Sequence, residues 1–466
     1  MSAIALLGIT SYDAVLSETV QKGLLVGEYS KALDLENSFR KNLETEDLPA
    51  GKGEKFTKFR KGRLTAQRIP RGGAKLTSLD GGYSPETNKS EQYTWNLQRY
   101  GHTVDTEATG SAVSFRNNLR EDAENIGMNA GETLDLITRL NYMMAYKAGT
   151  TFIDTTESGD QTTLEVDNIY GFMMKMKSGV PTAVSGTNKL EVWINGVANN
   201  VTGAAQDTTS VTIDGDSKTV DAVRESDDGL PGTITVETIV NAPQLGWEVR
   251  SKYAPQQIRP NGRKTEYQLA AGDTLTMAHI NAAVSGIMGR GGKPMEGDQG
   301  MGFYGYFCPE HRDQLWNDPA FYSWFQSQGG TDSFRNMDIS RAGNVIFDFT
   351  GRPAFRAHPD ATKAAAGVYV RNALIVARGA LVEGRSQELL GRPDMTPEIS
   401  NTFVRIFDKK QFVEIILRAP NDRRGKIVST TWEAILDQVA TTDSLTKNGS
   451  VCPDADHKRG ALIQTV

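Results

Sequence analysis

The spacing of apolar residues between positions 120 and 148 predicts one long helix. Apolar side chains recur there every three or four residues, which is the period of one helical face. The helix would be about 40 Å long at ~1.5 Å per residue. We expect Gly127 and Gly131 to kink or split its first part, and Gly149 to end it. The stripe expected to face the core consists of Leu134, Ile137, Leu140 and Met144.

Residues 55–105 show instead the period-two alternation of β-strands. The segments 56–60 and 64–69 alternate, and a second run starts at Tyr93 and continues, after a change of phase, to Val104. The change of phase predicts a β-bulge. We therefore expect a long two-stranded arm. Because an isolated hairpin is marginally stable in water, the arm should lie on another surface.

Residues 185–264 have the pattern of a small all-β module inserted into a larger host. Short β-rich runs lead into Asn195-Gly196 and Asp214-Gly215, and another follows Pro231-Gly232. Asn-Gly and Asp-Gly between such runs are the strongest short-range signals of β-hairpins. The module should therefore consist of consecutive hairpins.

The rest of the chain predicts an α+β host for this module. The segment beyond Leu445 is expected to be mobile. Helices are expected at 274–288 and 310–325, a buried strand at 302–308, further strands at 345–349, 353–357 and 368–376, and a strand pair at 401–407 and 412–417.

The charge distribution changes the picture of the arm. The 466 residues include 51 Lys and Arg and 57 Asp and Glu, a net charge of −6. This balance argues against a protein that coats nucleic acid through bulk charge. Residues 51–75, however, hold nine basic residues and one acid, whereas residues 1–50 hold four basic and eight acidic residues. The cationic arm could grip phosphates, but an acidic neighbouring subunit fits its alternating pattern better.

Candidate chemistry is sparse. The two cysteines, Cys308 and Cys452, exclude a disulfide scaffold and a four-cysteine zinc site. Residues 286–293 lack the first glycine and the final Ser or Thr of a phosphate-binding loop. Cys308 and His311 form a single C-x-x-H pair, which favours a buried structural cysteine. The acidic runs 44–47 and 227–228 are expected to be solvated loops. We therefore expect a structural protein, not an enzyme, with no cofactor and no metal.

The expected location follows from two further features. The first ten residues are apolar but carry no basic leader, so they make a poor secretory signal. The longest apolar runs are far shorter than the ~20 residues that cross a bilayer. We expect no membrane association, and a protein that resides in a cytoplasm or is released from one.

The order of these segments resembles that of a tailed-phage major capsid protein with the HK97-like fold, in the branch typified by N-four-type short-tailed phages. Residues 55–105, with the run 97–102, are similar to its extended loop and return strand. Residues 302–318 look like the strand–helix entry of its axial domain. Residues 403–419, followed by 423–428 and Trp432, look like its closing strands.

The resemblance implies a division of the chain into domains. Residues 1–54 would be an N-terminal arm, 55–104 the extended β-hairpin loop, 105–155 and 396–418 a peripheral domain with 120–148 as its spine helix, 156–395 and 419–440 an axial domain interrupted by the inserted β domain 185–264, and 441–466 a C-terminal tail. It also implies that the extended loop contacts neighbouring subunits through Phe56, Lys58, Phe59, Arg60, Arg63, Arg68, Arg71, Tyr93 and Trp95.

The function implied by the resemblance is self-assembly. Hexamers and pentamers would form an icosahedral shell that encloses double-stranded DNA without reading its sequence. A scaffolding protein and a portal would act during assembly in the host bacterial cytoplasm, and a cement or decoration protein is a further partner that the resemblance allows. The final location would be the virion capsid. Two alternatives stay open: an encapsulin-like nanocompartment shell, and a carbohydrate-binding surface protein with Trp193 and Trp247 as stacking residues.

Overall fold

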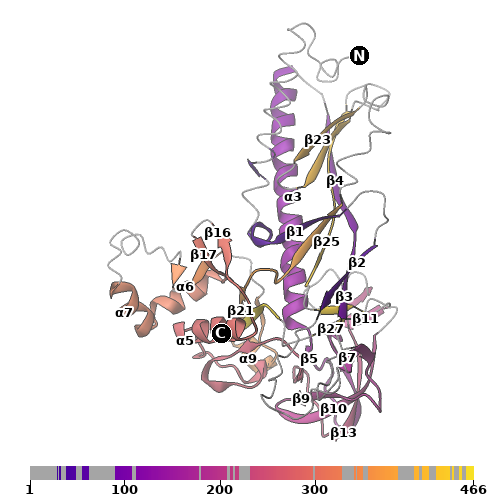
Figure 1. The fold of residues 1–466 in the computed structure, drawn as a ribbon, viewed down its shortest axis with the longest axis vertical. Coiled ribbons are helices and arrows are strands. Elements are labelled where there is room, and N and C mark those ends of the chain that lie inside the picture. Colours follow the sequence, from indigo (N-terminus) through magenta and orange to yellow (C-terminus); the bar gives the residue numbers. More distant parts are fainter. Residues whose placement is uncertain are drawn as a thin grey trace, which may run out of the picture.

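The molecule is elongated along helix α3, with an α+β body at one side and a β module at one end (Figure 1). It was obtained as a computed structural model. The structure describes residues 29, 31–32, 38–48, 55–61, 90–107, 112–177, 180–206, 210–213, 216–219, 231–297, 300–327, 341–342, 344–349, 355–386, 403–408, 412–418, 427–440, 443–445, 451–453 and 458–466.

Helix α3 (Ala112–Lys147) confirms the predicted long helix, although it begins before residue 120. Its 36 residues span about 54 Å at ~1.5 Å per residue. The helix is continuous through Gly127 and Gly131, so the predicted break is wrong. Gly127 instead admits a neighbour, because a Cβ there would lie 2.7 Å from the carbonyl oxygen of Tyr29. Gly149, with φ +75, follows the helix end as predicted.

A six-stranded sheet lies against α3 (Figure 1). Buried Leu134 and Ala130 of the helix pack on Trp432 and Leu436 of the sheet. Its strand order is β1 (Glu44–Leu48), β22 (Val382–Ser386), β25 (Ile427–Val439), β24 (Val413–Arg418) and β23 (Phe403–Asp408), and β4 (Gln98–Glu107) also pairs with β25.

This sheet corrects three expectations. The acidic run 44–47 lies in β1, parallel to β22, and not in a loop. Strand β4 pairs with β25 along residues 98–107, so the two-stranded arm does not extend to residue 105. Strand β25 joins the sheet of β23 and β24, whereas residues 419–440 were expected in the other domain. The pair β23–β24 itself is confirmed.

The predicted hairpin exists in a shorter form. Strand β2 (Lys55–Lys61) pairs antiparallel with β3 (Ser90–Asn96), and Phe56 lies opposite Trp95. The phase change in the sequence corresponds to Leu97, where β3 ends and the chain passes into β4. The predicted strand 64–69 lies outside the described residues.

The β module begins near residue 150 and not at 185. Its turn at Asn195 and Gly196, with φ 45 and 84, is the predicted one. The module starts earlier because two strands before residue 185 complete its six-stranded sheet, in the order β5 (Thr150–Phe152), β14 (Glu248–Ser251), β9 (Leu190–Ile194), β10 (Val197–Gln206), β13 (Gly232–Val240) and β6 (Gln161–Val166). Two-stranded pairs are formed by β7 (Met174–Lys177) with β8 (Val180–Ala183), and by β11 (Ser210–Ile213) with β12 (Asp216–Thr219).

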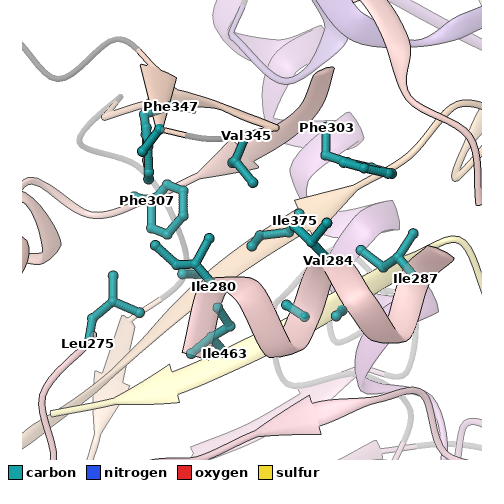
Figure 2. Packing of buried hydrophobic residues seen from close by; sticks show 14 of the residues in the cluster. Leu275, Ile280, Val284, Ile287, Phe303, Phe307, Val345, Phe347, Ile375 and Ile463 are labelled. Atoms are coloured by element: carbon teal, nitrogen blue, oxygen red, sulfur yellow. The ribbon is translucent and has the colours of Figure 1, made fainter. Parts of the chain in front are cut away.

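The body contains an eight-stranded sheet covered by α5 (Met277–Gly289). Figure 2 shows Ile280, Val284 and Ile287 of this helix directed toward the strands. The main strand order is β15 (Gln257–Ile258), β28 (Gly460–Thr465), β21 (Tyr369–Val376), β17 (Gly300–Tyr306), β19 (Val345–Asp348) and β18 (Arg341–Ala342), with β16 (Met295–Gly297) on β17 and β20 (Phe355–Ala357) on β21.

Strand β28 contradicts the expectation of a mobile tail. It lies between β15 and β21, and all of its residues are buried. The predicted helix 310–325 is two helices, because Pro319 starts a second one. The remaining elements are α6 (Pro309–Trp316), α7 (Pro319–Ser327), α9 (Ala361–Ala365), η1 (Arg40–Asn42), η2 (Pro260–Gly262), η3 (Glu266–Gln268), β26 (Asp443–Leu445) and β27 (Val451–Pro453).

Candidate assembly arms

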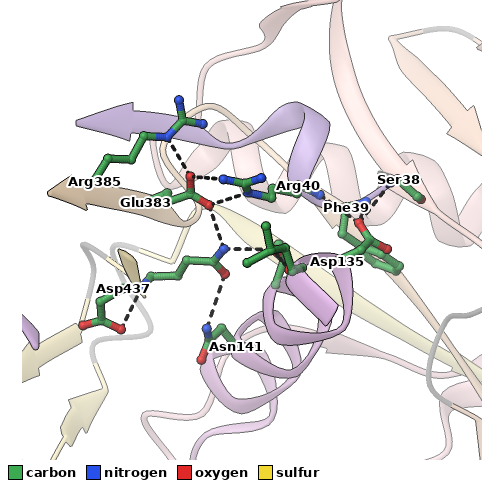
Figure 3. Close-up of polar contacts among 11 residues, drawn as sticks. Ser38, Phe39, Arg40, Asp135, Asn141, Glu383, Arg385 and Asp437 are labelled. Carbon is green, nitrogen blue, oxygen red and sulfur yellow. Dashed lines mark hydrogen bonds and ion pairs between the residues drawn. The ribbon is translucent and has the colours of Figure 1, made fainter. Parts of the chain in front are cut away.

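The segment before β1 is fixed to the body by a buried ion pair. Arg40 of η1 is 4% exposed, and Glu383 of β22 is fully buried. Nε and Nη2 of Arg40 donate to the two carboxylate oxygens of Glu383 at 2.9 and 3.0 Å. Nε of Arg385 donates to the same carboxylate at 2.7 Å (Figure 3). Two guanidinium groups therefore neutralise one buried acid. The contact of Arg40 with both carboxylate oxygens is the geometry in which Arg–carboxylate pairs are strongest.

The network continues to the spine helix through Gln438 of β25. Its Nε2 donates to Glu383 and to Thr138 Oγ1, both at 2.9 Å. Burial disfavours the charged form of Glu383, but the charges and hydrogen bonds of Arg40 and Arg385 outweigh it and lower its pKa to about 2. The carboxylate therefore stays ionised, and it joins η1, β22 and β25 in one cluster.

Asp135 of α3 holds the start of η1. Its Oδ1 accepts hydrogen bonds from the backbone N–H groups of Ser38, Phe39 and Arg40 at 2.9, 2.7 and 3.1 Å. The ring of Phe39 stacks on Tyr306, with 4.3 Å between the ring centroids. One carboxylate thus satisfies three consecutive backbone N–H groups, at the first residue of η1 and the two residues before it. The direction in which the N-terminal segment meets the body is fixed.

Trp95 roots the hairpin in the body. It is fully buried and packs with Leu48 and Val382. Its Nε1 donates to the carbonyl oxygen of Val382 at 3.2 Å. A Cβ on residue Gly384 would come within 2.9 Å of the indole, so that glycine makes room for the ring. The prediction that Trp95 contacts a neighbouring subunit is therefore wrong, because its side chain lies in the core of its own chain.

Two polar contacts complete the root. The backbone N–H of Asn96 donates to Asp437 Oδ2 of β25 at 2.6 Å. Burial raises the pKa of Asp437 to about 6. Lys58 forms an ion pair with Glu46 of β1 and lies 5.7 Å from the Trp95 ring centroid. The base of the cationic hairpin thus meets the acidic β1 within one chain, where the sequence led us to expect an acidic neighbour.

The other predicted site residues fall into three groups. Phe56 and Tyr93 are partly buried beside Trp95, and the Tyr93 and Trp95 rings meet edge to face at 5.1 Å between centroids. Along the spine helix, Leu134 is fully buried, and Ile137, Leu140 and Met144 are half-buried. Phe59 and Arg60 lie in β2 without described side chains, and Arg63, Arg68 and Arg71 lie outside the described residues.

Sequence reasoning missed Arg40, Asp135 and Glu383. They come from three distant segments, and Arg40 and Glu383 are 343 residues apart. Buried charges are normally paired, but no local pattern shows which pairs form. The only signal available in the sequence concerned Glu383. It is a charged residue in an apolar run that ends in β22, and charged residues are rare in such runs.

Cys308 and His311 have a structural role. The buried Cys308 is a free thiol, as predicted, and burial raises its pKa to about 12. Its backbone N–H donates to His311 Nδ1 at 3.1 Å. Burial, with the charge of Arg371 next, lowers the pKa of His311 to about 3, so the ring stays neutral. The thiol therefore stays protonated and is a poor nucleophile.

Other candidate chemistry is limited. Residues 286–289 form the last turn of α5 and residues 290–293 follow it, whereas a phosphate loop must lead into the start of a helix. Among the described residues, no group of three or more His, Cys, Asp or Glu side chains is placed to hold a metal ion. None of the described helices combines the length and the apolar character needed to span a membrane.

The chain is similar in structure to several phage capsids. The capsid of Ralstonia phage GP4 matches with 12% sequence identity and a TM-score of 0.47, over 92% of this chain and 91% of that chain. The capsid asymmetric unit of cyanophage Pam1 matches with 11% identity and a TM-score of 0.43, over 93% and 92%. The acidic stable capsid of Helicobacter pylori bacteriophage KHP30 matches with 8% identity and a TM-score of 0.43, over 90% and 87%.

All three similar structures are phage capsids. No protein-family model matches the chain, and no curated protein matches it. At TM-scores of 0.43 to 0.47 the similarities describe the arrangement of the chain and carry no conclusion about its function.

Proposed function

We propose that this chain is a major capsid protein of a tailed bacteriophage. Its copies would assemble as hexamers and pentamers into an icosahedral shell that encloses double-stranded DNA. The observation that carries this proposal is the hairpin β2–β3. Its root is fixed in the body by Trp95 and Asp437, yet among the described strands β2 and β3 pair only with each other.

Trp95 packs the base of the hairpin on its own body, so the further surface would be needed by residues 62–89, which connect the two strands. Isolated hairpins are marginal in water, and among the described strands neither β2 nor β3 pairs with a third strand. The residues between the two strands, 62–89, include five basic and two acidic side chains. The whole chain carries a net charge of −6, so the acidic surface of a second copy is the complementary partner.

The positive charge of the hairpin falls into two parts, one of which is Lys58, paired with Glu46. The basic residue at the root is already paired within the chain. Arg63, Arg68 and Arg71, which follow β2, are therefore the proposed contacts with a neighbouring subunit. Each exposed ion pair would contribute only ~0.2–1 kcal/mol, so the stabilisation comes from many copies in a closed shell.

Arg40, Arg385 and Gln438 surround Glu383 and form a clamp that joins η1 to the sheet. This clamp around Glu383 supports the same role. Rigid fixation of η1 and the hairpin root would make every copy project its arms in the same direction, which a closed assembly requires. In the proposed division, residues 1–54 are the arm and 55–96 the extended loop. The sheet that contains β4, β23, β24 and β25 forms the peripheral domain with α3, and the β module is inserted from about residue 150. A scaffolding protein and a portal are proposed partners, the virion is the proposed location, and no enzymatic step is proposed.

The test is a deletion that spares the root. Residues 62–89 are replaced by a two-glycine linker between Lys61 and Ser90, which keeps Trp95 and Asn96 in place. We expect a folded subunit, checked by circular dichroism and thermal unfolding, that forms no closed particles in electron micrographs. Substitution of Arg63, Arg68 and Arg71 by Gln should weaken assembly, and the matched substitution by Lys should largely preserve it. Closed shells of normal size from the deletion variant would remove the role proposed for the hairpin.

A further inference from the structure

A cavity of about 440 Å³ lies in the β module, where its outer face meets the segment that leads to the body. This volume falls within the ~300–1,000 Å³ typical of small-molecule sites. One wall is the outer face of β9 and β14, and another is formed by residues 263–265. The cavity is therefore separate from the hairpin root and from the clamp around Glu383.

The strand register places an aromatic and a cationic side chain on the same wall. Trp193 of β9 lies directly opposite Arg250 of β14. The neighbouring residues Val192 and Val249 point to the other face of the sheet, into the core of the module. Trp193 is 41% exposed and lines the cavity, so part of its ring is accessible to a ligand there.

The cavity has more positive charge than its own carboxylates neutralise. The one acidic residue of the lining, Glu248, is held by Arg259 Nη2 at 3.0 and 2.9 Å and by the backbone N–H of Glu266 at 2.7 Å. Lys252 is paired with Glu191. Arg250 donates to the carbonyl oxygen of Pro255 at 3.2 Å, and among the described residues it forms no ion pair, although the charge of Glu248 acts on it.

Two further groups in the lining point to an anionic ligand. Among the described residues, no carboxylate lies within ion-pair distance of the Lys264 amine, which lines the cavity. The Oγ1 atom of Thr265 is buried and has no hydrogen-bond partner in the described part of the chain. Thr265 is only 3% exposed, so water does not satisfy its hydroxyl readily. A buried polar group without a partner is costly, and rotation of the Thr265 side chain toward a ligand oxygen in the cavity would remove that cost.

We propose that this cavity binds a saccharide that carries a carboxylate or phosphate group. The C–H face of the sugar ring would lie on Trp193, the anionic group would face Arg250 and Lys264, and Thr265 would donate a hydrogen bond to a sugar oxygen. The cavity offers one aromatic wall and polar groups elsewhere. This suits a pyranose ring, which is apolar on one face and hydroxylated around its edge. Binding at this cavity would not require shell formation.

The test uses the full chain as purified subunits and four probes: glucuronic acid, glucose 6-phosphate, neutral glucose and AMP. Saturation-transfer NMR and calorimetric titration measure binding. We expect both acidic sugars to bind, the better of them identifying the carboxylate or the phosphate as the preferred group. Neutral glucose should bind at least about tenfold more weakly, because charge-assisted hydrogen bonds are about twice as strong as neutral ones.

Variants locate the site. Trp193→Ala and Lys264→Gln should each weaken binding of the acidic sugar about tenfold, which corresponds to one lost strong contact. Trp193→Phe keeps an aromatic ring and should retain most of the affinity. This control separates loss of the stacking ring from a folding defect caused by loss of the tryptophan. Lys189→Gln removes an exposed cation of the same module outside the cavity, and it should change nothing. Failure of both acidic sugars to bind, equal binding of glucose, tighter binding of AMP, or unchanged affinity in Trp193→Ala and Lys264→Gln would each overturn the proposal.

Discussion

The polar cluster at the arm root and the polar cavity of the β module are built from the same kinds of residue. They differ in whether the polar groups of those residues have hydrogen-bond partners within the chain. At the root, Arg40 and Glu383 are buried and joined by two hydrogen bonds, and Gln438 extends the network to the spine helix. In the cavity, Thr265 has an unsatisfied hydroxyl, and Trp193 is exposed. A fully satisfied buried network holds segments together, whereas a partly satisfied one near the surface is suited to bind something else.

The two tryptophans give the largest expected contrast. Trp95→Ala should destabilise the chain by about 3–5 kcal/mol, because it leaves a cavity at the hairpin root and removes the donor for Val382. Trp193→Ala should change the free energy of unfolding by about 1 kcal/mol or less, since 41% of the residue is exposed to solvent. Chemical denaturation of both variants measures the difference. Equal effects would show that the two rings do not differ in role.

The buried acid at the arm root should come next. Glu383→Gln should cost about 3 kcal/mol, because it leaves two guanidinium groups without their shared carboxylate. The matched control is Glu191→Gln, which breaks the exposed pair with Lys252 and should have no measurable effect on unfolding. A cost for Glu383→Gln as small as that of the control would contradict the clamp.

The same acid gives the root a pH dependence. Its pKa is lowered from 4.5 to about 2 in the folded chain, so its stabilisation is complete above pH 4.5 and is lost as the pH falls toward 2. Asp437 should act in the opposite direction. Its folded pKa is raised from 3.8 to about 6, so its contribution to stability improves as the pH falls from 6 toward 4. Unfolding of Glu383→Gln and Asp437→Asn at several pH values separates the two. Identical slopes in both variants would contradict this assignment.

The smallest expected effect concerns Lys58. Its ion pair with Glu46 is partly exposed, so Lys58→Gln should cost only about 0.2–1 kcal/mol, and less at high salt. Unfolding curves at low and high ionic strength measure it. A loss comparable to that of Trp95→Ala would mean that charge, and not the buried ring, holds the hairpin root.

Local patterns in the sequence predicted the elements that depend on neighbouring residues. The helical stripe at 134–144, the strand pair β23–β24 and the turn at Asn195 and Gly196 are all present. The failures are long-range. Strand β28 is central because it pairs with β21, whose residues precede it by about ninety positions, and a short apolar run such as Ala461–Ile463 does not reveal such a partner.

The candidate site was less predictable than the fold. Alternation in β3 placed Trp95 on one face of a strand, but it could not show whether that face meets its own body or another copy. The structure decides this, because Gly384 provides the space for the ring. Thr265 and Lys264 were invisible as site residues, since a cavity is formed by segments that only the fold brings together.

The most direct test of self-assembly is electron microscopy of the full chain after expression and concentration, with light scattering on the same sample. We expect closed icosahedral particles built from many copies, with the hairpin of each copy lying on its neighbour. A chain that stays monomeric at every concentration and salt condition tested, with or without a co-expressed scaffold, would contradict the proposed function.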